Sequence, residues 1–337
     1  MINFIQFTIT RAALSIVTLL IVCFIVFSLM ELVPGTCAER YLAFKNTQGS
    51  QITFEDIVAE EKRLGLDKPF LYRYTKWVSD IVVKQDFGDS CILRISINEL
   101  LSGRFLLSLF IAITALLFSY AIAIPVGIIS ATTKYATLDN TLKFISYLGI
   151  ALPNFLVALC IMLFMTVYYG DTMTGLFSQE YERAPWSAAK IKDFLSRAWL
   201  PIFVLGWNAT AFALQTVRAL MLDESDKLYV MAARARGVSG MSLLWRYPAK
   251  HSLGPVINSI GFDLNRIFSA LPVVALILVL TEAGALLIEA LARSNDQQLA
   301  GAIIFLLTAT IVFVNFVTDI ILAIMDPRIR KGVMGGN

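Results

Sequence analysis

The chain has few charged residues and a single histidine, and both features limit the classes of protein to which it can belong. Of its 337 residues, 16% are charged and 57% are hydrophobic. Soluble domains carry about 25% charged residues, so an ordinary soluble protein is excluded. The formal net charge of +3 is too small to indicate a nucleic-acid partner. His251 directly follows a lysine, and it fits a solvated or packing residue better than a catalytic base or a metal ligand.

Motifs for catalysis and nucleotide binding are missing as well. No G-x-x-x-x-G-K-[ST] pattern occurs, so the chain has no P-loop and cannot be the ATP-hydrolysing part of a machine. The patterns G-x-G-x-x-G, H-E-x-x-H and G-x-S-x-G are also absent. No Cys-x-x-Cys pair and no cluster of cysteine and histidine indicates a metal site. A membrane enzyme would need a clustered set of catalytic residues, which the sequence does not show.

The chain has only four cysteines, and they fall into two groups. Cys23 and Cys160 lie inside apolar runs, where cysteine usually serves as a small packing residue. Cys37 and Cys91 lie outside these runs, in one extramembrane segment. They could form a disulfide if this segment faces an oxidising compartment; the alternative is two unpaired thiols.

Long apolar runs are the main feature that is present. A transmembrane helix needs about 20 apolar residues, and membrane helices tolerate the glycines and prolines that interrupt these runs. The sequence therefore predicts an all-α polytopic membrane protein with six transmembrane helices. The first run is too long for the core of a cleavable signal peptide, so we expect it to be retained. The six runs cover residues 9–33, 106–133, 144–169, 199–221, 254–281 and 301–325.

The distribution of lysine and arginine predicts the orientation. Cytoplasmic loops are enriched in these residues, and the rule applies to short loops. With the N-terminus inside, the two short outer loops, 170–197 and 282–300, hold five lysines and arginines in total. The segment 34–104 is long enough to cross the membrane regardless of its charge. Both termini are therefore expected in the cytoplasm.

The segment 34–104 is expected to be an extracytoplasmic insertion with structure of its own. Its apolar residues recur at helical intervals in two stretches, which Gly65 and Pro69 separate, so two short amphipathic helices are expected. The loop 170–197 is expected to add an interfacial helix. The predicted division is a first helix at 1–33, the insertion at 34–104, a five-helix core at 105–328 with a cytoplasmic loop at 222–253, and a cytoplasmic tail at 329–337.

The cytoplasmic loop contains a polar, basic stretch, YVMAARARGVSGMSLLWRYPAKHSLGP. Tyr229 to Arg236 favours a helix, and Gly237 offers the positive φ that ends one. A second helix is expected from Ser239 to Tyr247, where Pro248 ends or kinks it. Two interpretations stay open from the pattern alone. The stretch forms either a compact knob facing the cytosol or an amphipathic hairpin on anionic headgroups.

These residues resemble the EAA signature of inner-membrane permease subunits of ABC importers, in the peptide/nickel group. Within that group the chain resembles the B-type subunit of dipeptide and oligopeptide permeases. The stretches LVPGT, RLGLDKPFLYRYTKWV, DFGDS, LGIALPNFLVAL and NFVTDIILAIMDPRIR also resemble elements of that group, in order and at its spacing. The matching positions of the signature are Tyr229, Val230, Ala233, Arg234, Ala235, Arg236 and Gly237, with Pro255 eighteen residues later.

The resemblance implies a non-catalytic subunit that forms a translocation path for peptides. Nickel or another small solute is the alternative cargo, and a stand-alone secondary transporter is a distant alternative. The implied partners are a second homologous permease subunit, two ATPase subunits and an extracytoplasmic binding protein. This chain would bind no cofactor, because ATP and magnesium belong to the ATPase subunits. The implied location is the bacterial inner membrane.

The resemblance also implies roles for individual residues of the loop. In such importers the EAA helices dock into a groove on the ATPase. Gly237 would be the tight turn, and Arg234 and Arg236 would meet polar or acidic groups of the partner. The small side chains Ala232, Ala233 and Ala235 would allow close approach.

The sequence departs from the group's pattern at three places. Tyr247-Pro248 replaces a polar pair without proline, so the second coupling helix is expected to be shorter. Cys37 stands where an aspartate is common, and Glu282 stands where a glycine is common. The outer turn at Glu282 is therefore expected to differ in shape.

Three charged residues interrupt the last two spans. Asp263 and Arg266 lie three residues apart on one face of the fifth span. Charges within a membrane are costly and usually face the bundle interior or a water-filled cavity. Two interpretations stay open: the pair lines the cytoplasmic part of the path, or it is a structural ion pair near the inner headgroups. Asp319 in the last span is expected to be structural and hydrogen-bonded to a neighbouring helix.

Overall fold

The computed structural model consists of helices joined by short connections, and it confirms the all-α class. Within the described residues, the only strand-like feature is one isolated bridge between Asp89 and Ser96. The predicted tail, 329–337, and the D-P-R-x-R end of the closing motif lie outside the described residues. The structure describes residues 2–49, 53–133, 135–170, 173–182, 184–294 and 296–325.

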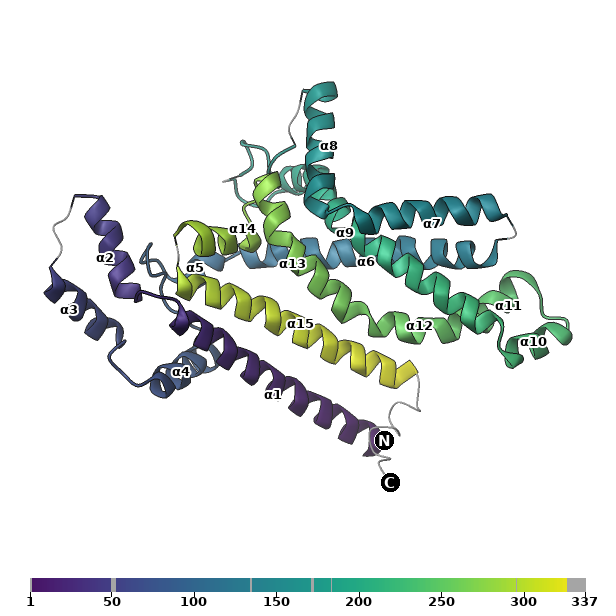
Figure 1. Ribbon diagram of the computed structural model, residues 1–337, viewed down its shortest axis with the longest axis horizontal. Coiled ribbons are helices and arrows are strands. Elements are labelled where there is room, and N and C mark those ends of the chain that lie inside the picture. Colours follow the sequence, from purple (N-terminus) through teal and green to yellow (C-terminus); the bar gives the residue numbers. More distant parts are fainter. Residues whose placement is uncertain are drawn as a thin grey trace. The chain divides into compact units, whose positions relative to one another are not determined.

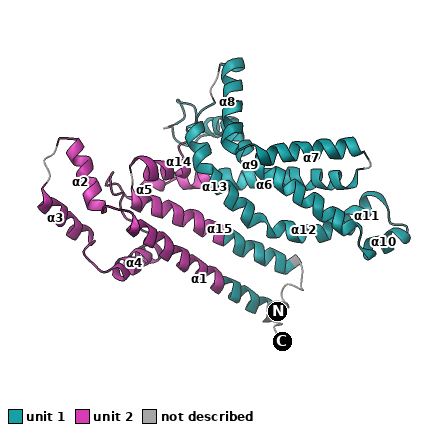
Figure 2. Cartoon of the chain, in the orientation of Figure 1, with its two compact units in different colours: residues 1–12, 109–280, 313–337 teal, residues 13–108, 281–312 magenta. Residues whose placement is uncertain are grey.

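The chain forms two compact units, shown in different colours in Figure 2. One unit comprises residues 1–12, 109–280 and 313–337, and we call it the inner unit. The other comprises residues 13–108 and 281–312, and we call it the outer unit.

Five helices in the described part of the chain are long and apolar enough to cross a membrane, or six spans if one bent helix pair is counted. This agrees with the six predicted spans. The bent pair corresponds to the third predicted run. The five helices are α1 (Ile2–Leu32), α6 (Arg104–Thr132), α9 (Ala188–Ser225), α13 (Ile260–Leu278) and α15 (Gln297–Met325).

The third predicted span is broken rather than straight. Helix α7 (Ala136–Ala151) and helix α8 (Asn154–Tyr169) meet at a bend of 100°. Pro153 explains the break, because proline lacks a backbone N–H and disfavours the helical conformation of the preceding residue.

The predicted interfacial helix in the loop 170–197 is wrong as a separate element. Helix α9 begins at Ala188, and the Ser187 side chain accepts a hydrogen bond from the backbone N–H of Lys190 at its N-terminus. The helix then continues through Pro201 to Ser225. At 1.5 Å per residue its 38 residues reach about 57 Å, well beyond the roughly 30 Å of a hydrocarbon core. The first turns of α9 therefore replace the expected interfacial helix.

The fifth predicted span is also divided. Helix α11 (Gly240–Arg246) ends before Pro248, as predicted, and Pro248 begins a further helix, α12 (Pro248–Asn258), where its missing N–H costs nothing. Helix α13 follows after Ser259.

Helix α9 is the centre of the inner unit. Helices α7, α8, α12 and α13 all pack against it (Figure 1). Small residues bring α7 and α9 together: a Cβ added at Gly149 would lie 2.7 Å from the Cβ of Ala211. Such close approach is the usual way in which helices associate in membranes.

The outer unit contains the segment 34–104, which was predicted to be an insertion with structure of its own. The two predicted amphipathic helices are confirmed as α3 (Phe54–Leu64) and α4 (Phe70–Ser79), with Gly65 at a φ of +71° between them. Helix α2 (Cys37–Thr47) was not predicted, although Thr36 and Glu39 form the capping box that starts it. An aromatic core holds the segment to the spans: Trp77 packs against Phe27 of α1 and Phe305 of α15.

Candidate functional site

The basic stretch folds as two short helices around Gly237, as predicted. Helix α10 spans Leu228–Ala235 and helix α11 spans Gly240–Arg246, each within a residue or so of the expected ends. Gly237 has a φ of +87°, and its N–H donates a hydrogen bond to the carbonyl of Arg234 at 3.0 Å. We call residues 228–247 the hairpin.

The hairpin has a small apolar core of its own. Val230, Ala233 and Leu243 are buried, and Val238 and Tyr247 pack against them. Ala233 is fully buried, so it brings α10 and α11 together instead of offering space to a partner. Tyr247, one of the departures from the family pattern, fills this core. The hairpin is therefore a compact knob.

One set of hairpin side chains remains exposed. Four of them are large and apolar, and three are cations. Leu228 has 81% of its surface exposed, the largest value among the four apolar side chains. We call this set the exposed face: Leu228, Met231, Ala232, Arg234, Ala235, Arg236, Met241, Trp245 and Arg246.

Tyr229 joins the hairpin to the helices that flank it. Its ring centroid lies 5.1 Å from that of His251 in α12, and its hydroxyl donates a hydrogen bond to the carboxylate of Glu224 in α9. Burial, followed by the Glu224 carboxylate, raises the pKa of Tyr229 above its ordinary value. The lone histidine is thus a packing partner of this tyrosine.

Pro255 does not lie in the hairpin. It sits inside α12, on an exposed position, while its neighbour Val256 packs with Met221 of α9. The structure thus separates it from the other residues of the predicted coupling site.

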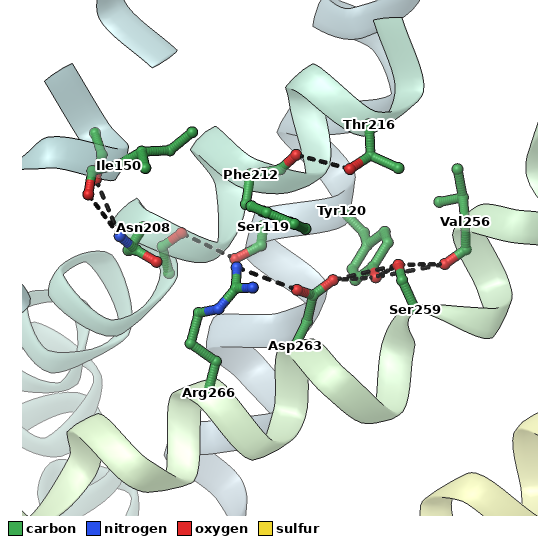
Figure 3. A network of polar contacts seen from close by, with 12 residues as sticks. Ser119, Tyr120, Ile150, Asn208, Phe212, Thr216, Val256, Ser259, Asp263 and Arg266 are labelled. Carbon is green, nitrogen blue, oxygen red and sulfur yellow. Dashed lines mark hydrogen bonds and ion pairs between the residues drawn. The ribbon is translucent and has the colours of Figure 1, made fainter. Parts of the chain in front are cut away.

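A second polar site lies within the inner unit, around Asp263 of α13 (Figure 3). Asp263 is 1% exposed. The hydroxyl of Tyr120, from α6, donates a hydrogen bond of 2.6 Å to its Oδ2 atom, and the hydroxyl of Ser259 donates one of 3.4 Å. Tyr120 and Ser259 also contact each other at 2.9 Å. Neither hydroxyl was predicted: nothing in the sequence relates Tyr120 of α6 to α13, whereas Ser259 lies four residues before Asp263, a helical spacing that could have indicated it.

Arg266 faces Asp263, as the three-residue spacing predicted. Its Nη1 atom lies 3.5 Å from Oδ1 of Asp263, and its guanidinium carbon lies 4.1 Å from the ring centre of Phe212 in α9 (Figure 3). The Arg266 side chain is 35% exposed, so Asp263 is much the more buried of the two.

Asn208 of α9 supports the break in the third span. Its Nδ2 atom donates hydrogen bonds to the carbonyls of Gly149 and Ile150 at 3.2 and 3.4 Å. These carbonyls belong to the last turn of α7 and lose helical partners at the break. The sequence assigned no role to Asn208. It lines a cavity of about 270 Å³ together with Asn154, Phe155, Ala270, Val273 and Val274.

Two ion pairs tie other spans of the inner unit together. Arg218 of α9 contacts both carboxylate oxygens of Asp139 in α7, at 2.8 and 2.9 Å. Asp319 of α15 lies 3.2 Å from Arg11 of α1. Asp319 therefore has a partner on another helix, as expected, although that partner is a cation.

Two predicted positions lie in the outer unit. Cys37 and Cys91 are joined in a disulfide with their Cα atoms 5.4 Å apart. Glu282 is completely buried and caps α14 (Ala283–Ile288), accepting hydrogen bonds from the backbone of Gly284 and Ala285 and from the Ser108 hydroxyl. Burial raises the pKa of Glu282. Glu282 therefore shapes the turn before α14, at a position where a glycine is common in the group of permeases that the chain resembles.

Among the described residues, no group of three or more histidine, cysteine, aspartate or glutamate side chains could hold a metal ion. The two polar sites offer charge, hydrogen-bonding groups and apolar contacts.

Comparison with known families gives two matches on this chain. The model described as binding-protein-dependent transport system inner membrane component matches residues 123–331, and the model for the N-terminal part of such components matches residues 4–98. The first match alone covers more than half of the chain.

Curated relatives match over nearly the whole length. The oligopeptide transport system permease protein AppB of Bacillus subtilis (strain 168) is 28% identical over 328 residues, which cover 96% of this chain and 99% of that protein. The dipeptide transport system permease protein DppB of Escherichia coli (strain K12) is 25% identical over 342 residues, which cover 96% and 98%.

A solved structure shares the fold. The MetNI methionine ABC transporter, in an inward-facing conformation, matches with a TM-score of 0.54 and 16% identity. The match covers 68% of this chain and 97% of that one.

Proposed function

The chain belongs to the family of binding-protein-dependent transport system inner membrane components, and from this premise we propose that it forms the translocation path for peptides in an ATP-driven importer. The chain is a multi-pass permease subunit of an ABC importer. The single observation that carries the proposed mechanism is the hairpin, which folds around its own core and exposes apolar and cationic side chains.

The hairpin is the proposed docking element for a separate ATPase subunit. Arginine and large apolar side chains are enriched at the centres of protein interfaces. On the exposed face, Leu228, Met231, Met241 and Trp245 would fill a groove of the ATPase, and Arg234 and Arg236 would meet its acidic groups. Closure of the ATPase would then move α9 and α12, which the hairpin joins, and shift the path between inward and outward openings.

The proposed complex has several further parts. This chain pairs with a second homologous permease subunit, two ATPase subunits and an extracytoplasmic binding protein. ATP and magnesium bind to the ATPase subunits, and this chain performs no catalysis. Peptides are the proposed cargo because the oligopeptide and dipeptide permeases match over 96% of this chain.

The proposed orientation places both termini and the loop 222–253 in the cytoplasm. The insertion 34–104 then faces the outside. Disulfides persist mainly in oxidising compartments, so the Cys37–Cys91 bond supports this placement.

Asp263 and Arg266 are proposed to line the cytoplasmic part of the path. Their ion pair at 3.5 Å represents one state, and the two side chains separate in the other. Arg266 lies six residues after Ile260, the first residue of α13, and is therefore about 9 Å along the helix axis from that end. In the proposed orientation this is the cytoplasmic end of α13.

The test is to purify the chain from gently solubilised membranes and identify the proteins that accompany it. Wild-type chain should bring down a P-loop ATPase and a second permease, and Gly237→Asp should lose or uncouple the ATPase. Gly65→Asp is the matched control, because Gly65 also has a positive φ and nothing within 4 Å of an added Cβ, but lies in the extracytoplasmic segment. A chain that purifies alone and still moves solute would contradict the proposal.

A further inference from the structure

The guanidinium of Arg266 lacks the partner that such a group usually has. Its buried Nη1 atom has no hydrogen-bond partner among the described residues, and the same holds for Oδ1 of Asp263. The two atoms are 3.5 Å apart, so they attract each other without forming a hydrogen bond. Arginine most often meets a carboxylate through two parallel hydrogen bonds. That arrangement is missing here.

Asp263 depends less on Arg266 than a buried carboxylate normally would on its cation. Its other oxygen, Oδ2, accepts a hydrogen bond of 2.6 Å from Tyr120, and the Ser259 hydroxyl lies 3.4 Å away but has a closer acceptor in the Val256 carbonyl at 2.8 Å. A carboxylate held by the Tyr120 hydroxyl keeps part of its stabilisation when the cation moves away. The ion pair can therefore open without leaving Asp263 entirely unsupported.

Arg266 is held by contacts that a bound ligand would leave intact. Its guanidinium lies against the ring of Phe212, which keeps its N–H edge free while supplying a cation–π contact. Its side chain is one-third exposed. Although Nη1 itself is buried, the rest of the side chain therefore leaves room for a second anion to approach the guanidinium.

A cavity lies one helical turn along α13 from Arg266. Ala270, four residues after Arg266, lines this cavity of about 270 Å³. The buried side-chain oxygen of Asn154, another residue of its wall, has no hydrogen-bond partner in the described part of the chain. An acceptor without a donor, on α8, thus lines a cavity whose wall includes the residue one turn of α13 beyond a cation without a bidentate anion.

We propose that Arg266 is a specificity-determining residue that binds the terminal carboxylate of the cargo. The guanidinium leaves Asp263 and takes the carboxylate in two parallel hydrogen bonds, while Asp263 stays with Tyr120 and Ser259. The adjoining cavity receives the chain that precedes this carboxylate, and the free oxygen of Asn154 accepts one of its N–H groups. This inference rests on the proposed function, since it needs a peptide cargo.

The test compares a peptide with its C-terminal amide. The complete importer is reconstituted in vesicles with its binding protein, and ATP-driven uptake of trialanine and trialanine amide is measured at saturating binding protein. Any preference of the binding protein contributes equally in every variant, so it cancels when the acid-to-amide uptake ratios of the variants are compared.

Arg266→Gln should lower this ratio by about tenfold, which corresponds to about 1.4 kcal/mol. Arg266→Lys keeps the charge but loses the planar fork, so its ratio should lie between those of the wild type and Arg266→Gln. Asp263→Asn frees the guanidinium from its resident anion, so its ratio should rise above the wild-type value even as its uptake rate falls.

Equal ratios in the wild type and these variants would overturn the carboxylate site while leaving the peptide cargo intact. If the Arg266→Gln importer takes up neither peptide, the acid-to-amide ratios of Arg266→Lys and Asp263→Asn decide. The proposal requires the first ratio to fall below the wild-type value and the second to rise above it. A wild-type importer that takes up neither peptide would overturn the proposed cargo, and the carboxylate site with it.

Discussion

The hairpin together with Glu224 of α9, and the Asp263 site, each contain a tyrosine, a carboxylate and arginine, in opposite surroundings. Each has a tyrosine whose hydroxyl donates to a carboxylate: Tyr229 to Glu224, and Tyr120 to Asp263. Each also has arginine. In the hairpin the arginines are exposed, whereas Asp263 is almost fully buried and its partner Arg266 is one-third exposed.

The difference shows two ways of using charge in one membrane protein. An exposed arginine is solvated at no cost and is ready to meet a partner from the cytosol. A buried charge carries a desolvation cost of several kcal/mol, which its ion pair only partly offsets. Residues that bear this cost usually serve a path through the membrane. Mutations in the hairpin are therefore expected to impair its folding or its binding of the ATPase. Mutations in the Asp263 site are expected to stop the Asp263–Arg266 ion pair from opening and closing.

The largest effect is expected from the core of the hairpin. Leu243→Ala empties a buried position, which typically costs about 2–5 kcal/mol, and the hairpin should no longer hold the ATPase. Leu228→Ala is the matched control for folding, since the same change at an exposed position leaves the hairpin folded even though it removes a proposed contact with the ATPase. Thermal melts compare the folding of the two variants, and co-purification shows whether Leu243→Ala has lost the ATPase. Equal destabilisation of the two variants in the melts would contradict a separate hairpin core.

The next effect is expected from the buried carboxylate. Asp263→Asn removes the charge that pairs with Arg266, and uptake should fall by about tenfold because the pair can no longer alternate between two states. Assembly of the complex should persist, as size-exclusion chromatography would show. Unchanged uptake would mean that the pair is merely structural, near the inner headgroups.

A smaller effect is expected from the exposed cations. Replacing Arg234 and Arg236 together by glutamine should weaken ATPase binding by about fivefold and reduce its sensitivity to salt. Thermal stability of the chain should stay the same, because neither side chain belongs to the hairpin core. If the double variant binds the ATPase as tightly as the wild type at low salt, these arginines do not belong to the interface.

The smallest effect concerns pH. The pKa of Tyr229 lies above its ordinary value of 10.0, so above pH 10 the folded hairpin holds a proton that the unfolded chain has lost. Stability should therefore be constant below pH 10 and fall as the pH rises beyond it. Tyr229→Phe should remove this part of the alkaline decline, whereas the same change at the exposed Tyr135 should not. Melts over a pH series compare the two variants, and identical alkaline profiles would contradict the expectation.

Much of the fold could be predicted from patterns that are local in the sequence. Apolar runs indicated the spans, and Gly237 marked the turn of the hairpin within a residue or so. An error was also local in origin: the residues from Ala188 were expected to form a separate helix, although they continue into the fourth span. Pro248 follows the end of α11, as expected, but it also begins α12, which was not predicted.

The candidate sites could be predicted only where their residues are neighbours along the chain. Asp263 and Arg266 share one helix, so their pairing followed from their spacing. Tyr120 lies 143 residues before Asp263, and Asn208 lies 58 residues after the Ile150 carbonyl that it contacts. No periodicity relates such positions.

The sequence by itself determined that the chain spans a membrane, where its helices run and which loop forms the hairpin, because these follow from apolar run length and backbone preference. Only the tertiary structure decided which carboxylate gained two hydroxyl partners, which guanidinium was left without a hydrogen bond at Nη1, and which face of the hairpin stayed exposed. The physical reason is that these features depend on distances between helices that are far apart in the sequence, which packing alone brings together.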